Sequence, residues 1–255
     1  MLNMKRRAKF WVWPYKGGSN AATGLADALG GRLIKRTNSR YRRQLRDFVI
    51  NWGSTSPIDY GPVVNHYNAV RLATSKMDTF RVLADAGVQV PAWTKDHKQA
   101  CEWAERGRIL GRDLDKGSQG KGITVYERGA VVGEHLFYVR YMQKEREFRV
   151  HVVKGTVIFV QEKLKKKEVG DVGNKYVRSH RYGWCFAFKH LDDKPAPKAV
   201  LDIGVAAVRA LGLDFGAVDI AWSERSGATV LEVNTAPGIE ESSLVAYADA
   251  FQRLL

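Results

Sequence analysis

Two short apolar segments late in the sequence carry oxygen-bearing side chains that could bind a metal ion. The segment LEVNTAPGIEES (231–242) alternates apolar and polar residues before a Pro-Gly turn. Alternation with period two places Glu232 and Asn234 on the same face of a strand. Asp219 lies in the preceding segment FGAVDIAW, and SERSGAT between them is typical of a hairpin turn. Oxygen ligands without His or Cys favour Mg²⁺ over zinc or copper.

A glycine-rich loop earlier in the chain could bind phosphates. The stretch RILGRDLDKGSQGKGITVYE (108–127) predicts a strand, a loop with glycines at 117, 120 and 122, and a second strand. Backbone N–H groups at such a flexible hairpin tip can fold over phosphates. The stretch is not a Walker A loop, which needs Gly-Lys-Ser/Thr at the start of a helix.

Charged residues also alternate along a predicted strand at 147–153. Glu147, Arg149 and His151 share one of its faces. Two roles for Arg149 stay open at this point, a site residue or the ion-pair partner of a nearby carboxylate.

The elements that position these residues follow from periodicity. A strand at 10–15, a glycine turn, a helix capped by Ser19 or Asn20 and strands in RLIKR and DFVINWG predict a small α/β unit with a parallel sheet. The end of that helix could hold an anion, although a tight turn alone is the simpler explanation of the glycines. An amphipathic helix is expected at SKMDTFRVLADAG, ending at Gly87. Strands near 136–141, 147–153, 156–163 and GWCFAF, and helices at KQACEWAER, APKAVLDIGVAAVRALG and SSLVAYADAFQRLL, complete the expected order.

Composition limits the class of protein. The 255 residues are 45% hydrophobic and 27% charged, which is typical of a globular chain. The sequence contains no apolar run long enough for a transmembrane helix, and its first residues do not read as a signal peptide. Cys101 and Cys185 lack metal-ligand spacing, so a reduced cytoplasmic protein is expected.

The charge favours anionic partners. The chain has 41 Lys and Arg against 27 Asp and Glu, a formal net charge of +14. The cations cluster in KRRAK, in IKRTNSRYRRQLR (34–46) and in KLKKK (163–167). Such clusters are also ordinary solvated surface, and no zinc finger, RNP motif or basic zipper accompanies them. Nucleic-acid binding is therefore left open.

Four blocks in order resemble the ATP-grasp superfamily, and in particular its RimK-like carboxylate–amine ligases. They are SKMDTFRVLADAGVQVPAWT, GRDLDKGSQGKGI, EREFRVHVVKGTVI and GAVDIAWSERSGATVLEVNTAPGIE. The resemblance covers about residues 65–246. It implies an α+β ATP-grasp fold, in which two α+β lobes sandwich ATP, with a short N-terminal α/β lobe. The expected division is 1–62 for the short lobe and 63–255 for the ATP-grasp domain, with its lobes at 63–140 and 141–255.

The resemblance also implies roles for individual residues. Asp219, Glu232 and Asn234 are expected to hold one or two Mg²⁺ ions, with Mn²⁺ as a substitute. The residues expected to bind ATP are Arg112, Gly117, Ser118, Gly120, Tyr141, Glu147 and Lys163, with Glu147 near the ribose and the backbone of 138–141 along the adenine edge. Arg149 is expected near the phosphates as a catalytic residue.

Two positions depart from the family pattern. Arg112 stands where a lysine usually precedes the glycine loop, and it can bind phosphate in a bidentate way. Ala217 stands where D-alanine–D-alanine ligases carry an arginine, which argues against dipeptide synthesis of that kind. Arg178 is the expected replacement as a catalytic residue.

The implied reaction is amide formation through an acyl phosphate. A substrate carboxylate attacks the γ-phosphate of ATP, ADP leaves, and an amine then attacks the acyl carbon and releases phosphate. The expected acceptor is a peptide, protein or small amine, with an acidic acceptor suggested by the cluster of cations at 34–46. Two alternatives stay open, a nucleic-acid-directed amino-acid ligase and a nucleotide-binding protein without catalysis.

Overall fold

The N-terminal lobe is a four-stranded parallel sheet. The computed structural model describes residues 9–57, 63–116, 120–166 and 176–255. The strands, in the order β2-β1-β3-β4, are β1 (Lys9–Pro14), β2 (Arg32–Leu33), β3 (Asp47–Trp52) and β4 (Val63–Val64). Helix α1 (Asn20–Ala28) connects β1 to β2, as a parallel pair requires. Its N-cap is Ser19, whose Oγ accepts a hydrogen bond from the backbone N of Ala22 at 3.3 Å. The predicted parallel sheet is confirmed.

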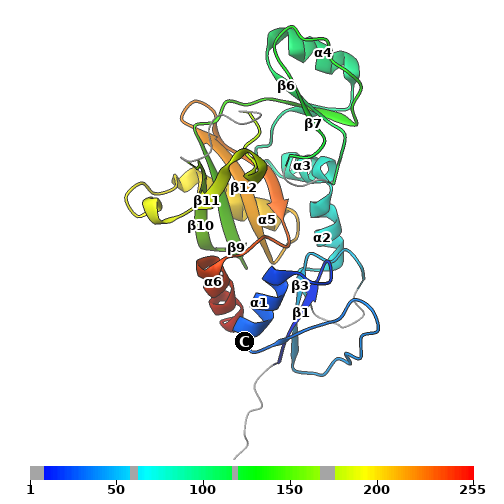
Figure 1. The fold of residues 1–255 in the computed structure, drawn as a ribbon, viewed down its shortest axis with the longest axis vertical. Coiled ribbons are helices and arrows are strands. Elements are labelled where there is room, and N and C mark those ends of the chain that lie inside the picture. Colours follow the sequence, from blue (N-terminus) through cyan, green and yellow to red (C-terminus); the bar gives the residue numbers. More distant parts are fainter. Residues whose placement is uncertain (1–8, 58–62, 117–119, 167–175) are drawn as a thin grey trace, which may run out of the picture.

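Two consecutive helices lead from this lobe to the next (Figure 1). They are α2 (Tyr67–Thr74) and α3 (Lys76–Asp85). Ser75 lies between them in an extended conformation and caps α3 through its Oγ, which accepts from Asp78 N. Gly87 follows α3 with φ +75°, the left-handed conformation expected after the end of a helix. The sequence predicted α3 but not α2.

The middle lobe carries the glycine-rich loop at the tip of a hairpin. Its strands, in the order β5-β8-β6-β7, are β5 (Trp93–Thr94), β6 (Ile109–Arg112), β7 (Ile123–Tyr126) and β8 (Phe137–Arg140), covered by α4 (His97–Arg106). β6 and β7 pair antiparallel, and Asp113 N donates to Gly122 O at the base of the loop. The predicted arrangement of strand, loop and strand is confirmed.

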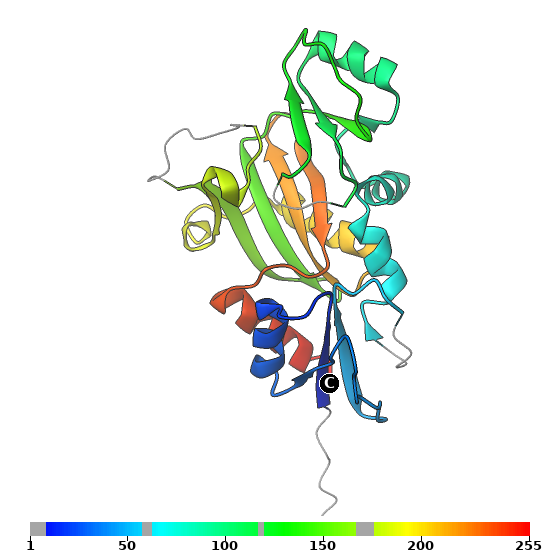
Figure 2. The same ribbon diagram turned by 45° about the vertical axis from the view of Figure 1, so that its right-hand side comes forward.

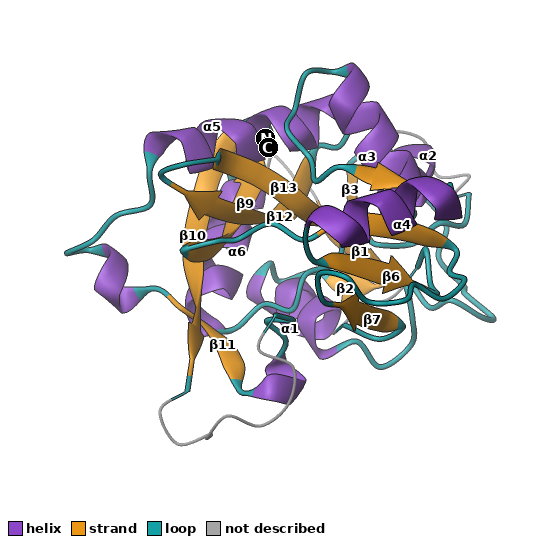
Figure 3. Ribbon diagram, turned by 90° about the horizontal axis from the view of Figure 1, so that it is seen from above, coloured by secondary structure: helices purple, strands orange, loops and turns teal. Residues whose placement is uncertain are grey.

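The third sheet is antiparallel and has the order β11-β10-β9-β12-β13. Its strands are β9 (Arg146–Val153), β10 (Thr156–Lys165), β11 (Trp184–Ala187), β12 (Phe215–Ser223) and β13 (Gly227–Asn234). Helix α5 (Lys198–Ala210) lies along one face of this sheet (Figure 3). Helix α6 (Glu241–Gln252) packs against α1, next to the N-terminal lobe.

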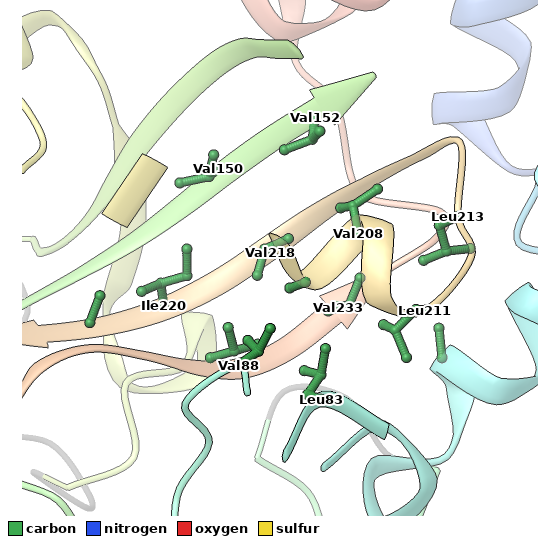
Figure 4. Close-up of a cluster of buried hydrophobic side chains, with 14 of the residues drawn as sticks. Leu83, Val88, Val150, Val152, Val208, Leu211, Leu213, Val218, Ile220 and Val233 are labelled. Carbon is green, nitrogen blue, oxygen red and sulfur yellow. The ribbon is translucent and has the colours of Figure 1, made fainter. Parts of the chain in front are cut away.

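Alternation along the strands, interrupted by bulges, divides this sheet into an apolar and a polar face. Val150 and Val152 on β9, Val218 and Ile220 on β12 and Val233 on β13 point toward α5 and its Val208 (Figure 4). Burying each such side chain stabilises the fold by about 1.5–3 kcal/mol. The residues between them therefore point to the opposite face, where the candidate site lies.

The lobes are joined by buried polar contacts. Asn65 is fully buried, and its amide donates to Phe215 O and accepts from the backbone N of Asp214 and Phe215.

Among the residues that the structure describes, no helix is both long and apolar enough to cross a bilayer. The divisions expected at residues 62 and 140 stay a proposal about folding units, with β4 (Val63–Val64) of the N-terminal sheet lying just past the first of them.

Candidate active site

Strand register brings four of the predicted site residues together. Asp219 on β12 lies opposite Glu232 on β13 and opposite Arg149 on β9, and Asn234 lies opposite Ala217. Directly opposed residues of antiparallel strands share a face. A bulge shifts the register between Asp219 and Ile220, and bulges of this kind redirect side chains next to active sites. The polar side chains of this face are Gln161, Lys163, Glu147, Arg149, His151, Asp219, Glu232 and Asn234.

Arg149 and Asp219 form a bidentate ion pair at the centre of this face. Arg149 Nε lies 2.7 Å from Asp219 Oδ1, and its terminal nitrogen Nη2 lies 2.9 Å from Oδ2. Burial opposes ionisation of both groups, but each partner outweighs that effect for the other. The pKa of Asp219 is consequently lowered and the pKa of Arg149 is raised. Arg149 is therefore a carboxylate partner in this structure, which is one of its two expected roles.

Glu232 is paired with a lysine that the sequence analysis missed. Lys76 Nζ lies 3.0 Å from Glu232 Oε1. Lys76 is the first residue of α3, at the helix N-terminus, where the helix dipole disfavours a cation. A lysine at this unfavourable position was the signal that the sequence offered, because a function in the site can compensate for the unfavourable interaction with the helix dipole.

Arg112 lies at the end of β6 with its Nε buried. That Nε has no hydrogen-bond partner among the residues placed by the structure. Burial lowers the pKa of its guanidinium, and the nearby charge of Glu232 opposes this effect. The Phe137 ring centroid lies 5.9 Å from its Cζ. A buried cation with an unused donor suits an anionic ligand.

Glu147 lies between two lysines. Lys163 Nζ is 2.5 Å from Oε1, and Lys144 Nζ is 2.9 Å from Oε2. Burial opposes ionisation of Glu147, but the two lysines outweigh it and lower the pKa of the carboxyl. The sequence analysis named Glu147 and Lys163 and missed Lys144, which lies three residues before Glu147 in a polar loop.

The summed charge of these groups suits a polyanion. Five cations face three carboxylates, an excess of two positive charges. The cations are Lys76, Arg112, Lys144, Arg149 and Lys163, and the carboxylates are Glu147, Asp219 and Glu232. An ATP molecule with one bound divalent cation would balance such an excess.

The donor set of Asp219, Glu232 and Asn234 fits Mg²⁺. The described parts of the chain hold no cluster of three His, Cys, Asp or Glu, so this set depends on the amide of Asn234. The Asn234 ligand would be its amide oxygen, because the Nδ2 is a hydrogen-bond donor; that nitrogen is buried and lacks a hydrogen-bond partner within those parts. Arg149 engages each Asp219 oxygen once, and an ionised carboxylate offers about four lone-pair sites. Oxygen donors of this kind are the ligands that Mg²⁺ prefers.

The structure describes only part of the glycine loop. Gly117 and Ser118 lie outside the described residues. Gly120 has φ +75°, and a Cβ there would lie 2.7 Å from Val177 Cγ1, so the hairpin packs closely against residues 177–179. Only a glycine permits both this backbone conformation and this contact.

Two expected site residues lie on the linker side. The backbone N of Tyr141 donates to Arg108 O at 3.0 Å, so that N–H is already used within the protein. Burial raises the pKa of the Tyr141 hydroxyl. Arg178 donates to Lys144 O at 3.0 Å, and its Cζ lies 4.7 Å from the centre of the Trp184 ring. These contacts hold Arg178 against the linker. The arginine that pairs with Asp219 is Arg149.

The fold and the site define the class. The chain has the ATP-grasp fold, as its likeness to solved structures shows. The structure of the ATP-grasp ligase PsnB, complexed with minimal precursor, Mg and ADP, superposes with a TM-score of 0.66 and 14% identity, covering 96% of each chain. No family model matches the sequence.

Curated relatives are ligases. A probable alpha-L-glutamate ligase of Klebsiella pneumoniae is 26% identical over 210 residues, which are 75% of this chain and 65% of the relative. The D-alanine–D-alanine ligase of Aquifex aeolicus is 25% identical over 194 residues, which are 71% of this chain and 64% of that protein. The chain thus spans somewhat less than two thirds of the length of these relatives.

Proposed function

We propose that this protein is an ATP-dependent carboxylate–amine ligase of the RimK-like kind. One observation carries the proposal, the polar sheet face where Asp219 and Glu232 lie side by side among five cations. The order of four sequence blocks and the ligases among the relatives support it. The product is an amide or peptide bond, formed with release of ADP and phosphate.

Each group of the site has a task in this proposal. Asp219, Glu232 and Asn234 would hold one or two Mg²⁺ ions, and bound Mg²⁺ would neutralise charge on the phosphates during transfer. Arg112, Lys163 and Lys76 would orient the phosphates, because a fixed cation stabilises charge that develops during phosphoryl transfer. Arg149 would keep Asp219 ionised and aligned.

The proposed substrates are ATP, a carboxylate and an amine acceptor, with a peptide as the favoured acceptor. PsnB is described with a precursor peptide, and the macrocyclase MdnC with precursor peptide MdnA, which supports a peptide here. The proposed location is the cytoplasm, which supplies ATP. The unpaired Cys101 and Cys185 agree with its reducing conditions.

The proposal is tested by ADP and phosphate release. The purified chain is mixed with ATP, Mg²⁺ and a panel of amino acids and acidic peptides, and products are identified by mass spectrometry. Acceptor-dependent ADP release with a new amide is the expected result, and Mn²⁺ should replace Mg²⁺. Tight ATP binding without ADP release from any acceptor would instead favour a nucleotide-binding protein without catalysis.

Arg112→Ala should weaken ATP binding by about tenfold or more while leaving adenosine binding unchanged. The change removes a charged donor to phosphate, and hydrogen bonds to charged groups contribute about 1.5–3 kcal/mol. Calorimetry with ATP and adenosine measures the difference. Arg106→Ala is the matched control, because Arg106 lies exposed at the end of α4 in the same lobe. Equal weakening of both ligands would show that Arg112 has only a structural role.

A further inference from the structure

The connection between β2 and β3 carries a dense positive charge. Residues 32–46 contain seven Lys or Arg and no Asp or Glu. Six of the seven are exposed, namely Arg32, Lys35, Arg36, Arg40, Arg42 and Arg46, and Arg43 is half-buried. We call residues 32–46 the basic segment. None of the site chemistry described above uses it.

The basic segment is held in a defined conformation. The Tyr41 hydroxyl donates to Asp47 Oδ2 at 2.8 Å, and the backbone N of Gln44 donates to the same oxygen at 2.8 Å. The Tyr41 ring is buried and lies 4.5 Å from the Trp11 ring. An ordered basic surface loses less conformational entropy on binding than a flexible one.

Arg36 is oriented at the carboxyl edge of the N-terminal sheet. Its terminal nitrogen Nη1 donates to Pro14 O at 3.1 Å and to Ser54 Oγ at 3.2 Å. Both bonds use the same nitrogen, so the Nε–Nη2 edge donates no hydrogen bond to any residue in the described parts of the chain. That edge is the fork that binds a carboxylate in a bidentate way.

This edge of the sheet adjoins the candidate active site. Asn51 and Ser54 hydrogen-bond reciprocally, at 2.9 and 2.8 Å, and fix the turn that follows β3. A Cβ on Gly53 would lie 2.6 Å from Ala236 Cβ, so the turn touches the chain two residues after Asn234. Figure 2 shows β13 ending above the N-terminal sheet, where β1 and β3 also end.

We propose that the basic segment recognises an acidic peptide, which passes Arg36 on its way into the active site. The inference deepens the proposed function and rests on it for the identity of the peptide as substrate. Exposed guanidinium groups bind carboxylates well, and they increase the rate of encounter with an acidic partner.

A peptide fits the segment better than a nucleic acid. Single-stranded nucleic acids are bound through aromatic side chains on which bases stack. Of the rings under the basic segment, Trp13 and Tyr41 are 8% and 6% exposed, and Trp11 is half-buried against Tyr41, so they offer little stacking surface. The segment forms a loop between β2 and β3, so it presents no helix to a DNA groove.

The test measures binding of labelled hexaglutamate by fluorescence anisotropy at low and physiological salt. The variant Arg40→Gln/Arg42→Gln/Arg43→Gln should raise the Kd about tenfold, since three surface ion pairs are lost. Arg36→Gln should raise it at least threefold, and Arg36→Lys should not restore it, because a lysine has no fork. The matched control is Lys98→Gln/Arg106→Gln/Arg209→Gln, which removes the same charge from exposed positions on α4 and α5 and should change the Kd less than twofold.

Three results would overturn the inference. They are no binding of hexaglutamate by the unaltered protein, equal effects of the two triple variants, and tighter binding of hexathymidylate than of hexaglutamate. The last result would favour a nucleic-acid partner. Because the probe is bound without ATP, the measurement is independent of catalysis. If the unaltered protein released ADP with an acceptor but did not bind hexaglutamate, this inference alone would be contradicted. If it bound hexaglutamate but released no ADP, the proposed function alone would be contradicted.

Discussion

Glu232→Gln is expected to lower Mg²⁺-dependent ADP formation by two to three orders of magnitude. Glutamine keeps the shape of the side chain, and its carbonyl oxygen can still accept from Lys76, which now lies 3.0 Å from Glu232 Oε1. The charge that would hold Mg²⁺ is lost, however. Removal of one preorganised electrostatic contact to the transition state typically costs about 10²–10³ in kcat.

The measurement is steady-state ADP formation at several Mg²⁺ concentrations. Part of the lost rate should return at high Mg²⁺, because the two remaining oxygen ligands still bind the ion weakly. Glu224→Gln is the matched control, since Glu224 is exposed in the turn of the same hairpin. An unchanged rate in a folded Glu232→Gln protein would remove Glu232 from the metal site.

Strand alternation made much of this face predictable from the sequence. Glu232 and Asn234 on one strand, and Glu147, Arg149 and His151 on another, follow from the period of two. The contact of Arg149 with Asp219 depends on the register of β9 against β12, across 70 residues of chain. A local pattern within one strand does not fix that register.

Other features had weaker local signals. Helix α2 has eight residues, about two turns, and only Val70 and Ala73 are buried, so its periodicity is too short to recognise. Lys76 meets Glu232 across 156 residues of chain, a contact that only the packing of α3 beside β13 creates. The hydrogen bond from the Tyr141 N–H to Arg108 O likewise depends on where the linker passes the end of α4.

The free energy of unfolding should fall as the pH falls from 6.5 toward 4, because of His151. This side chain is fully buried on β9, where its Nε2 lies 3.0 Å from Gln161 Oε1 and its Nδ1 lies 3.2 Å from the Tyr247 hydroxyl. Burial is the main cause that lowers its pKa from 6.5 to about 4, and the charge of Arg149 adds to it. Gln161 Oε1 can only accept, so the neutral ring donates from Nε2 and accepts the Tyr247 proton at Nδ1.

The sign follows from proton uptake. Between pH 4 and 6.5 the unfolded chain binds a proton at His151 and the folded chain does not, so stability rises with pH in this window. The contribution is complete above pH 6.5, and about 2 kcal/mol of it should be lost by pH 5, with one pKa unit equal to about 1.36 kcal/mol. Most carboxyl groups still remain ionised at pH 5, so their own titration adds little there.

Urea unfolding at pH 7.5 and pH 5 measures this loss, and His151→Gln should remove most of it. Glutamine can donate to Gln161 and accept from Tyr247, so it keeps both hydrogen bonds without a group that titrates in this range. His180→Gln is the matched control, because His180 is exposed. If the unaltered protein and His151→Gln lost the same free energy between the two pH values, His151 would not be the group responsible. A smaller loss in His151→Gln alone would show that this buried ring, on the same sheet face as Asp219 and Arg149, sets the acid limit of the fold.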